Sequence, residues 1–279
     1  MLMQQGEMPH LVRLYDPFDS LLHSSDGPSS GGVMALLRPI RDLLSARAEK
    51  GDKGKSAGLS AGRRRAIAMA LGKASWLNRL GDAFSASCLM IVGFQGHRGE
   101  AAEQLERAGQ LLESAGGVDG GEGPGLRWRE NRYSVSFKQS AIFESGAFVD
   151  TMEVSCTWGC VAQVYEAVRK AVASQALIMA HFSHAYAEGC SIYFTFASYR
   201  GKADALERCY NRVWRDALSA VSKAGGSISH HHGIGVAKRD AMRREHGAGL
   251  RLLFALKDGL DPTGVLNPGK LLPDRTVTS

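Results

Sequence analysis

The stretch GGSISHHHGIG, residues 225–235, places His230, His231 and His232 in a row between flanking glycines. Because glycine tolerates positive φ angles, this stretch predicts a tight connection between the helical patterns on either side. Imidazole has a pKa of about 6.5 in model peptides, so a histidine cluster suits proton transfer near neutral pH. In an extended segment alternate side chains share a face, which predicts that at most His230 and His232 face one ligand together.

Two other interpretations of the histidine run stay open, a solvated histidine-rich loop and a metal site. Conventional zinc ligands are spaced differently, which makes the metal site the weakest of the three interpretations, and we assign no metal ligand. A metal-dependent hydrolase would also need carboxylates, and only Asp240 and Glu245 lie near the run in sequence.

A second signal lies in residues 190–197, which alternate between apolar and hydroxyl side chains. Ile192, Phe194 and Phe196 fall on one face, whereas Ser191, Tyr193 and Thr195 fall on the other. We expect the apolar face to meet helices and the hydroxyl face to meet solvent or a ligand cavity. Alternation alone does not distinguish an ordinary sheet tyrosine at position 193 from a residue of a functional site.

The remaining pattern predicts an α+β fold, a mostly antiparallel sheet covered on one face by helices. Strands are expected at residues 11–16, 88–94, 148–154, 177–182 and 191–196. The run at 88–94 is predicted to be a central strand, and the last two strands are predicted to form a hairpin. Helices are expected at residues 33–48, 99–114, 161–172 and 206–221, with a helical segment near the C-terminus.

Composition excludes several classes of protein. The 279 residues carry a net charge of +6, but residues 46–66 hold seven basic and two acidic residues, which leaves about +1 elsewhere. We interpret residues 46–66 as a flexible basic insert rather than a nucleic-acid surface. No apolar run approaches the roughly 18 residues of a membrane helix, and the first residues lack a signal-peptide pattern. Five cysteines without a CxxC pair suit reduced thiols in the cytoplasm.

The motif SHHHGIG resembles the C-terminal part of FAD-linked oxidases of the vanillyl-alcohol-oxidase type, and within them the alkyldihydroxyacetonephosphate synthases. Further stretches agree in order: LVRLYD, LMIVGFQG, GEGPG, FVDTMEVSCTW, EGCSIYFTFASYRG and LDPTGVLNPGKLLP. The related hydroxy-acid dehydrogenases have SGEHGIG in place of SHHHGIG. The resemblance covers nearly the whole chain except the basic insert.

The resemblance implies that residues 1–273 form a ferredoxin-like cap domain that covers the substrate, with FAD as cofactor. It gives catalytic roles to Tyr193, His230, His231 and His232 and places Arg13 near the active site. Lys138 stands where the synthases carry an arginine near the flavin, and lysine offers a single mobile ammonium instead of a planar fork.

The N-terminal FAD-binding domain of the family has no counterpart here, and no GxGxxG segment occurs in the chain. The implied activity is the exchange of an acyl for an alkyl group on a lipid phosphate in ether-lipid biosynthesis. The alternatives are a flavin-linked dehydrogenase of a 2-hydroxy acid and a non-catalytic α+β module.

Overall fold

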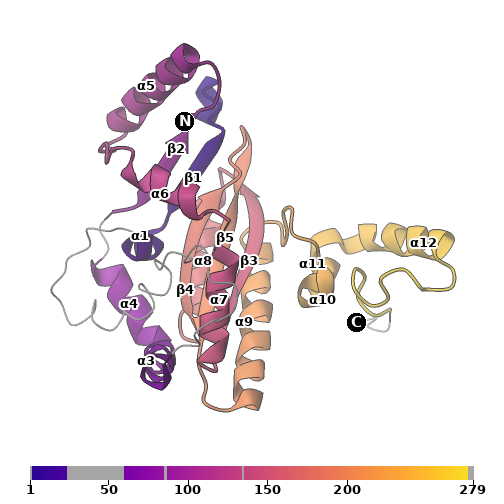
Figure 1. The fold of residues 1–279 in the computed structure, drawn as a ribbon. Coiled ribbons are helices and arrows are strands. Elements are labelled where there is room, and N and C mark those ends of the chain that lie inside the picture. Colours follow the sequence, from indigo (N-terminus) through magenta and orange to yellow (C-terminus); the bar gives the residue numbers. More distant parts are fainter. Residues whose placement is uncertain (1, 24–59, 85–86, 134, 276–279) are drawn as a thin grey trace, which may run out of the picture.

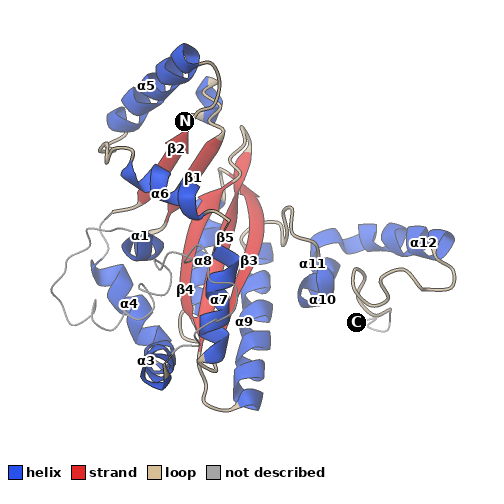
Figure 2. Cartoon of the chain, in the orientation of Figure 1, coloured by secondary structure: helices blue, strands red, loops and turns tan. Residues whose placement is uncertain are grey.

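The computed structural model describes residues 2–23, 60–84, 87–133 and 135–275. Five strands form one antiparallel sheet in the order β2-β1-β4-β5-β3 (Figures 1 and 2). The strands are β1 (Leu11–Tyr15), β2 (Leu89–Gly93), β3 (Phe148–Thr157), β4 (Leu177–Ser183) and β5 (Gly189–Ser198). The predicted α+β class and the β4–β5 hairpin are therefore confirmed.

The prediction that the apolar run at residues 88–94 is a central strand is wrong, because β2 lies at an edge of the sheet. Its side chains are shielded instead by α6 (Gly123–Asn131), where Gly125 lies against Ile91. A continuous apolar run cannot distinguish a strand flanked by two others from an edge strand covered by a helix.

One face of the sheet carries the main hydrophobic core. Helices α8 (Val161–Val172) and α9 (Ala203–Lys223) lie side by side against this face (Figure 1). Ile192, Phe194 and Phe196 of β5 are fully buried there, as the alternation predicted. The helices meet them with valines at helical spacing, Val164, Val168 and Val172 from α8 and Val213 and Val221 from α9.

Helices also cover part of the opposite face, which corrects the prediction of a sheet covered on one face only. They are α1 (Pro17–His23), α3 (Ala61–Gly72), α4 (Ala74–Phe84) and α7 (Val135–Glu144). Leu177 and Met179 of β4 pack there, while Ile178 between them faces the main core. The strands are apolar on both faces at this end, so both faces need cover.

The predicted basic insert, residues 46–66, is only partly described. Residues 46–59 lie outside the described part of the chain, and so does the helix predicted at 33–48. Residues 61–66 are not a flexible segment, because they form the first turns of α3, where the Ser60 hydroxyl accepts a hydrogen bond from the Arg63 amide. The N-cap and the buried Ile67 side chain order this end of the insert.

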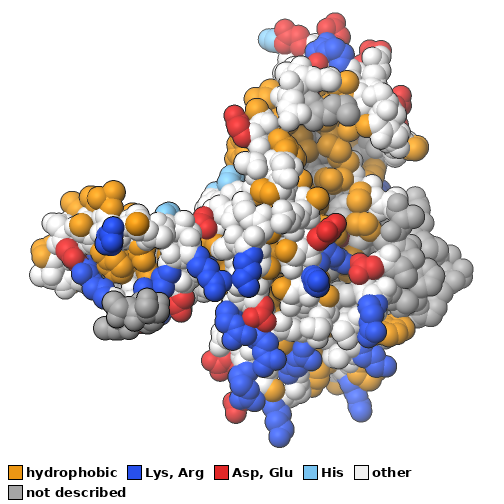
Figure 3. All heavy atoms as spheres, turned by 180° about the vertical axis from the view of Figure 1, so that it is seen from behind, with side chains coloured by type: hydrophobic (Ala, Val, Ile, Leu, Met, Phe, Trp, Pro, Cys, Tyr) orange, Lys and Arg blue, Asp and Glu red, His pale blue; other side chains and the backbone are white. Residues whose placement is uncertain are grey.

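The remaining helices lie away from the sheet centre. Helix α5 (Arg98–Ser114) confirms the helix predicted at residues 99–114. Helices α10 (Gly235–Lys238), α11 (Met242–His246) and α12 (Leu250–Leu260) form an arm that projects from the sheet (Figure 1). Hydrophobic side chains gather on this arm, among them the exposed Leu252, Leu256 and Leu260 (Figure 3). Within the described residues, no helix has the length and apolar character to cross a membrane.

Gly189, at the start of β5, tests how closely β5 packs against β3. A Cβ atom at this position would lie 2.1 Å from the carbonyl oxygen of Cys156 on β3. We expect Gly189→Ala to lower the free energy of unfolding by about 1–3 kcal/mol or more, because backbone must move to relieve the overlap. Urea unfolding measures the change. Gly159→Ala is the matched control, since a Cβ at Gly159 has no neighbour within 4 Å, and an equal loss in both variants would contradict the steric account.

Candidate active site

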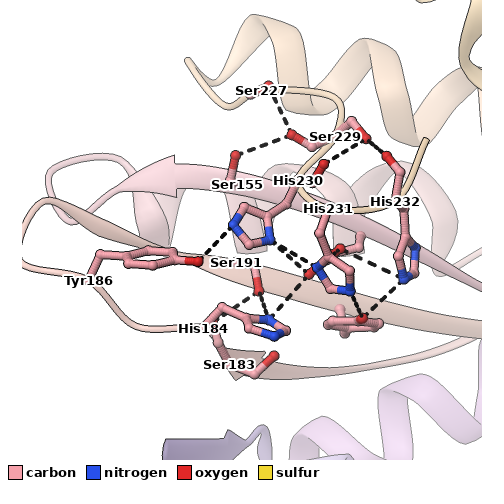
Figure 4. A network of polar contacts seen from close by, with 12 residues as sticks. Ser155, Ser183, His184, Tyr186, Ser191, Ser227, Ser229, His230, His231 and His232 are labelled. Carbon is pink, nitrogen blue, oxygen red and sulfur yellow. Dashed lines mark hydrogen bonds and ion pairs between the residues drawn. The ribbon is translucent and has the colours of Figure 1, made fainter. Parts of the chain in front are cut away.

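The histidine run lies in a loop that is fastened to the edge strand β3. Helix α9 ends at Lys223, and Gly225 turns the chain with a φ of 82°. Ser227 and Ser155 then pair through their backbones, with N–O distances of 2.8 and 3.2 Å. Gly226 lies so close to Val221 and the Ser155 carbonyl oxygen that a Cβ atom would have contacts of 2.9 and 3.3 Å. The chain therefore enters the histidine run at a fixed position (Figure 4).

Beneath the loop lies Glu153 of β3, a carboxylate with no solvent exposure. Its Oε1 atom is 3.3 Å from His230 Nδ1, which has hydrogen-bond geometry. Its Oε2 atom is 2.9 Å from His231 Nδ1, within ion-pair distance although the ring is not aligned for a hydrogen bond. His184 Nδ1 lies 3.5 Å from Oε1, and His232 Nε2 lies 3.8 Å from Oε2. Four imidazoles thus surround one buried carboxylate.

Tyr193 lies opposite Glu153 in the β3–β5 register and joins the same cluster. Its hydroxyl is 3.2 Å from His231 Nε2 and 3.0 Å from His232 Nε2. Its ring stacks on His181 of β4 with 4.9 Å between centroids. The loop bends through residues 229–232 instead of running extended, so all three consecutive histidines converge. The prediction that at most His230 and His232 share a ligand-facing side is therefore wrong.

The electrostatic environment favours neutral groups around Tyr193. Burial, followed by the Glu153 charge, raises the pKa of Tyr193 to about 12, with Arg13 acting in the opposite direction. Burial lowers the pKa of both His184 and His232, against the attraction of Glu153. Near neutral pH Tyr193 is therefore a phenol, able to donate a hydrogen bond and unsuited to act as a base.

The structure describes the side chain of Arg13 but not that of Lys138. Arg13 on β1 donates a hydrogen bond from Nη2 to His181 Nε2, while its buried Nε atom has no hydrogen-bond partner among the described residues. An unpaired buried donor on a cationic side chain suits an anionic ligand group. Lys138 is a residue of helix α7, but its side chain is not described.

Lys238 is a buried cation that ties the loop to the strand. Its Nζ atom donates to the Glu153 carbonyl oxygen at 2.9 Å and to the Ser229 hydroxyl at 3.1 Å. Burial lowers the pKa of Lys238 to about 8, against the opposing influence of Glu153 and Glu245. Lys238 therefore links α10, the loop and β3 through uncharged acceptors.

A cavity of about 770 Å³ opens from this cluster. Its volume falls in the range of small-molecule sites, roughly 300–1,000 Å³. Tyr193, His181, His232 and Arg13 line it. The wall is mainly apolar and includes Val12, Ile91, Trp128, Ile142 and Met179, although Asp19, Arg127 and Arg132 also contribute to it. The cavity can hold a long apolar group with its polar end beside Tyr193.

Sequence reasoning missed three members of the cluster, Glu153, His181 and His184. Glu153 was visible as a single acid between Met152 and Val154 in a predicted strand, which alternation places away from the main core. Only the strand register, however, sets Glu153 opposite Tyr193 and beneath the histidines.

The cluster also has a composition that suits a metal ion. Ligand atoms of Glu153, His184, His230 and His231 all lie within 4.8 Å of one another. Three imidazoles and one carboxylate are ligand types that zinc accepts. The assignment of no metal ligand from the sequence therefore stays a prediction.

The fold agrees with comparisons to known proteins. The model of the family "FAD linked oxidases, C-terminal domain" matches residues 47–271. Alkyldihydroxyacetonephosphate synthase of Trypanosoma brucei brucei is 30% identical over 194 residues, which are 66% of this chain and 31% of that protein. The synthase of Dictyostelium discoideum is 25% identical over 275 residues, covering 95% of this chain and 40% of that protein.

A solved structure of an alkyldihydroxyacetonephosphate synthase has the same fold, with a TM-score of 0.54 and 19% identity. The match covers 95% of this chain and 40% of that structure. The chain therefore belongs to the C-terminal domain family of the FAD-linked oxidases, which are flavin-dependent enzymes. The chain spans 31% of the length of the Trypanosoma synthase and 40% of the length of the Dictyostelium synthase.

The residues present fit one end of the family's FAD cofactor. Hydrogen-bonding side chains of Tyr193, His232 and Arg13 face an open cavity, as the reactive ring system of a flavin with its substrate requires. No GxGxxG loop for a pyrophosphate occurs in the sequence. These residues therefore fit the reacting side of the cofactor.

The lowered pKa of Lys238 gives a pH test of its burial. Folded Lys238 loses its proton near pH 8, whereas the unfolded chain keeps it until about pH 10.5, so the unfolded state binds more protons in this window. We expect the free energy of unfolding of the wild type, relative to Lys238→Met, to rise from pH 8 to 10.5 by at most about 3 kcal/mol. Urea unfolding at several pH values measures it, with Lys223→Met at the end of α9 as control. If the difference in unfolding free energy between wild type and Lys238→Met did not change with pH, the lowered pKa of the buried Lys238 amine would be contradicted.

Proposed function

We propose that this chain is the substrate-binding and catalytic part of an FAD-dependent enzyme of ether-lipid biosynthesis. The enzyme exchanges the acyl group of an acyl-dihydroxyacetone phosphate for the alkyl group of a fatty alcohol. One observation carries the proposal: Tyr193 and His232 of the cluster line a large, mainly apolar cavity. That combination fits a reaction between a polar phosphate ester and a long hydrocarbon chain.

The exchange requires a group that accepts a proton. The fatty alcohol loses its proton as its oxygen forms the new bond to carbon, and the acyl group leaves as a carboxylate, so no net oxidation occurs. Neutral imidazoles of His230, His231 and His232 are suited to accept that proton, with Tyr193 as a hydrogen-bonding partner. FAD, when bound, supplies the reactive centre that holds the substrate carbon during exchange.

The substrate class follows from the cavity wall and from its cations. The partly buried Arg13 guanidinium fits the phosphate of the acyl substrate. From the family resemblance we assign Lys138 of α7 to the neighbourhood of the substrate or the flavin as well. The apolar wall formed by Ile91, Trp128 and Ile142 fits the alkyl chain of the alcohol. The substrate is therefore a lipid phosphate in this proposal.

The wider assembly is part of the same proposal. Residues 1–273 act as one substrate-covering domain that works with an FAD-binding domain, carried on the same polypeptide or on another one. The described cysteines are all free, which suits a cytoplasmic location. Nucleic acid is not among the proposed partners.

The proposal is tested with the flavin-loaded enzyme, in which this chain is present together with its FAD-binding domain. We expect labelled hexadecanol to enter an alkyl ether in the presence of acyl-dihydroxyacetone phosphate, with release of a fatty acid. Reduction of the flavin by a 2-hydroxy acid without ether formation would instead assign a dehydrogenase. Absence of both reactions in a flavin-loaded preparation would leave the non-catalytic module.

Tyr193→Phe and His231→Ala test the roles given to these residues in that enzyme. We expect each to reduce turnover about 10²- to 10⁴-fold, the range typical of acid–base groups, without loss of flavin. If the two groups act as a unit, the double variant is little worse than the poorer single variant. Tyr186→Phe is a control, because the hydroxyl of the exposed Tyr186 hydrogen-bonds to His230 and, among the described residues, not to Tyr193 or His231. A fully active Tyr193→Phe enzyme would remove Tyr193 from the mechanism.

Thr195→Phe tests the alkyl site, since Thr195 lines the cavity two residues beyond Tyr193 on the same face. The larger phenylalanine ring should occupy the part of the cavity that the alkyl chain of a long alcohol needs. We therefore expect the KM for hexadecanol to rise more than about tenfold, while octanol is still used. Comparison of kcat/KM across alcohol lengths measures this. As a control, Thr157→Phe on the exposed end of β3 should keep the wild-type preference among alcohol lengths. An equal loss of kcat/KM for all alcohols in Thr195→Phe would refute the assignment of the alkyl site.

A further inference from the structure

A row of polar side chains crosses the sheet from the buried Glu153 to the wall of the cavity. The strand registers set Glu153 of β3 opposite Tyr193 of β5, and Tyr193 opposite His181 of β4. His181 in turn lies opposite Tyr15 of β1. Arg13 is two residues from Tyr15 and therefore lies on the same face of β1. The sheet thus places His181 between Tyr193 and Arg13, and both of them contact its ring.

We propose that His181 is a positioning residue that holds the Arg13 guanidinium in place for the anionic group of a ligand in the cavity. Arg13 donates from Nη2 to His181 Nε2, and its buried Nε atom has no hydrogen-bond partner among the described residues. Both side chains line the cavity. That the ligand is a phosphate ester rests on the proposed function, whereas the alignment of Arg13 by His181 does not.

The contact with Arg13 fixes the protonation of His181. A guanidinium has N–H donors and no acceptor, so the Nε2 atom of His181 must supply the lone pair. A neutral imidazole has a single N–H group, which then lies on Nδ1. A protonated His181 would instead turn an N–H group toward the Arg13 donor. Solvent would screen that repulsion poorly, because the His181 side chain is only 13% exposed.

Asp19 of α1 fixes the orientation of the same ring. Its Oδ2 atom lies 3.5 Å from His181 Nδ1, within ion-pair distance, and the Asp19 side chain is 5% exposed. A half-turn of the ring about its Cβ–Cγ bond would place carbon atoms beside Asp19 and Arg13 in place of the two nitrogens. The carboxylate on one side and the guanidinium on the other therefore select one ring orientation, with Nδ1 beside Asp19 and Nε2 beside Arg13.

Arg13 differs from the two other arginines of the cavity wall. Arg127 and Arg132 also line the cavity, but both are exposed to solvent. Arg132 in addition donates to the Arg129 carbonyl oxygen. Of these three arginines, Arg13 is the one with a buried and unpaired N–H donor. A buried donor on a cation gains most from an anionic acceptor, because water does not compete for it.

His181 also fixes the distance between the anion-binding cation and the phenol of the site. Its ring lies nearly parallel to that of Tyr193, with 4.9 Å between centroids and 10° between planes. The ring that aligns Arg13 is therefore the ring on which Tyr193 stacks. A ligand whose anionic group binds Arg13 has its remaining part set at a defined position relative to Tyr193.

The protonation of His181 is measured on the 279-residue chain labelled with ¹⁵N-histidine. Long-range ¹H–¹⁵N correlation at pH 8.5 distinguishes protonated from unprotonated ring nitrogens. We expect a protonated Nδ1 and an unprotonated Nε2 for His181, assigned by the signals that are missing from His181→Gln. A protonated Nε2 would overturn the proposal, because Arg13 would then have no acceptor on the ring.

Inorganic phosphate is the probe for the alignment of Arg13. In the ¹⁵N-arginine-labelled chain, the Nε–H signal of Arg13 is identified by its absence from Arg13→Lys and followed as phosphate is added. We expect this signal to shift in the wild type. The dissociation constant should rise about tenfold in His181→Phe, which keeps a ring beside Tyr193 but offers no acceptor. An Arg13 signal that does not respond to phosphate, or an unchanged constant in folded His181→Phe, would overturn the proposal.

His181→Gln separates hydrogen bonding from packing. Its Oε1 atom can accept from Arg13 but gives no ring for the stack, so the phosphate affinity should stay close to that of the wild type. His97→Phe is the matched control, because His97 is exposed at the start of α5 and is not among the described residues that line the cavity. If His181→Phe fails to fold by circular dichroism, His181→Gln and the wild-type tautomer decide. A tenfold loss of affinity in folded His181→Gln would contradict the acceptor role.

The flavin-loaded enzyme shows whether His181 acts through Arg13. His181→Phe should raise the KM for acyl-dihydroxyacetone phosphate about tenfold and leave the KM for hexadecanol unchanged. The double variant with Arg13→Met should be no worse than Arg13→Met alone, because no guanidinium is then left to align. Losses that multiply would contradict the positioning role. Failure of the wild-type enzyme to form an ether would refute the proposed function and leave the tautomer and the phosphate titration standing.

Discussion

The buried carboxylate of Glu153 is the constraint on which the arrangement of this site depends. An ionised carboxylate without solvent is costly unless N–H groups surround it. Glu153 lies on β3, which is an edge strand of the sheet in the described part of the chain, and the histidine loop pairs with that edge. The backbone pairing of Ser155 with Ser227 brings the loop to the strand, and the histidine run then places its imidazoles over the charge. The imidazoles of the loop and the carboxylate of the strand therefore depend on each other electrostatically.

The same sheet separates two environments. Its main face is closed by α8 and α9 and contributes packing only, since Phe194 and Phe196 are fully buried. On the opposite face, α3 and α7 cover one end and leave Tyr193 and Thr195 facing the cavity. A single strand, β5, thus carries core side chains and site side chains in strict alternation. Substitutions at Tyr193 can therefore change chemistry without disturbing the core behind it.

Prediction from the sequence succeeded where the determining interactions are local. The alternation in residues 190–197 gave the correct face for Tyr193, and the helical spacing of Val164, Val168 and Val172 gave the correct core. It failed where distant segments meet. The convergence of the three histidines depends on a bend and on Glu153, which lies 77 residues before His230. The edge position of β2 likewise depends on pairing with β1, which no local pattern encodes.

The energetics of proton transfer explain why a tyrosine in this cluster needs its histidines. A phenol with an ordinary pKa of about 10 holds its proton roughly 3.5 pKa units more strongly than imidazole, equivalent to about 5 kcal/mol. Burial and Glu153 raise the pKa of Tyr193 further, so the Glu153 charge works against a Tyr193 anion. A mechanism that leaves a phenolate is therefore disfavoured by the cluster itself. Tyr193 can take part only if it receives a proton from one neighbouring imidazole as it gives one to another, and the Nε2 atoms of His231 and His232 both lie within hydrogen-bond distance of its oxygen.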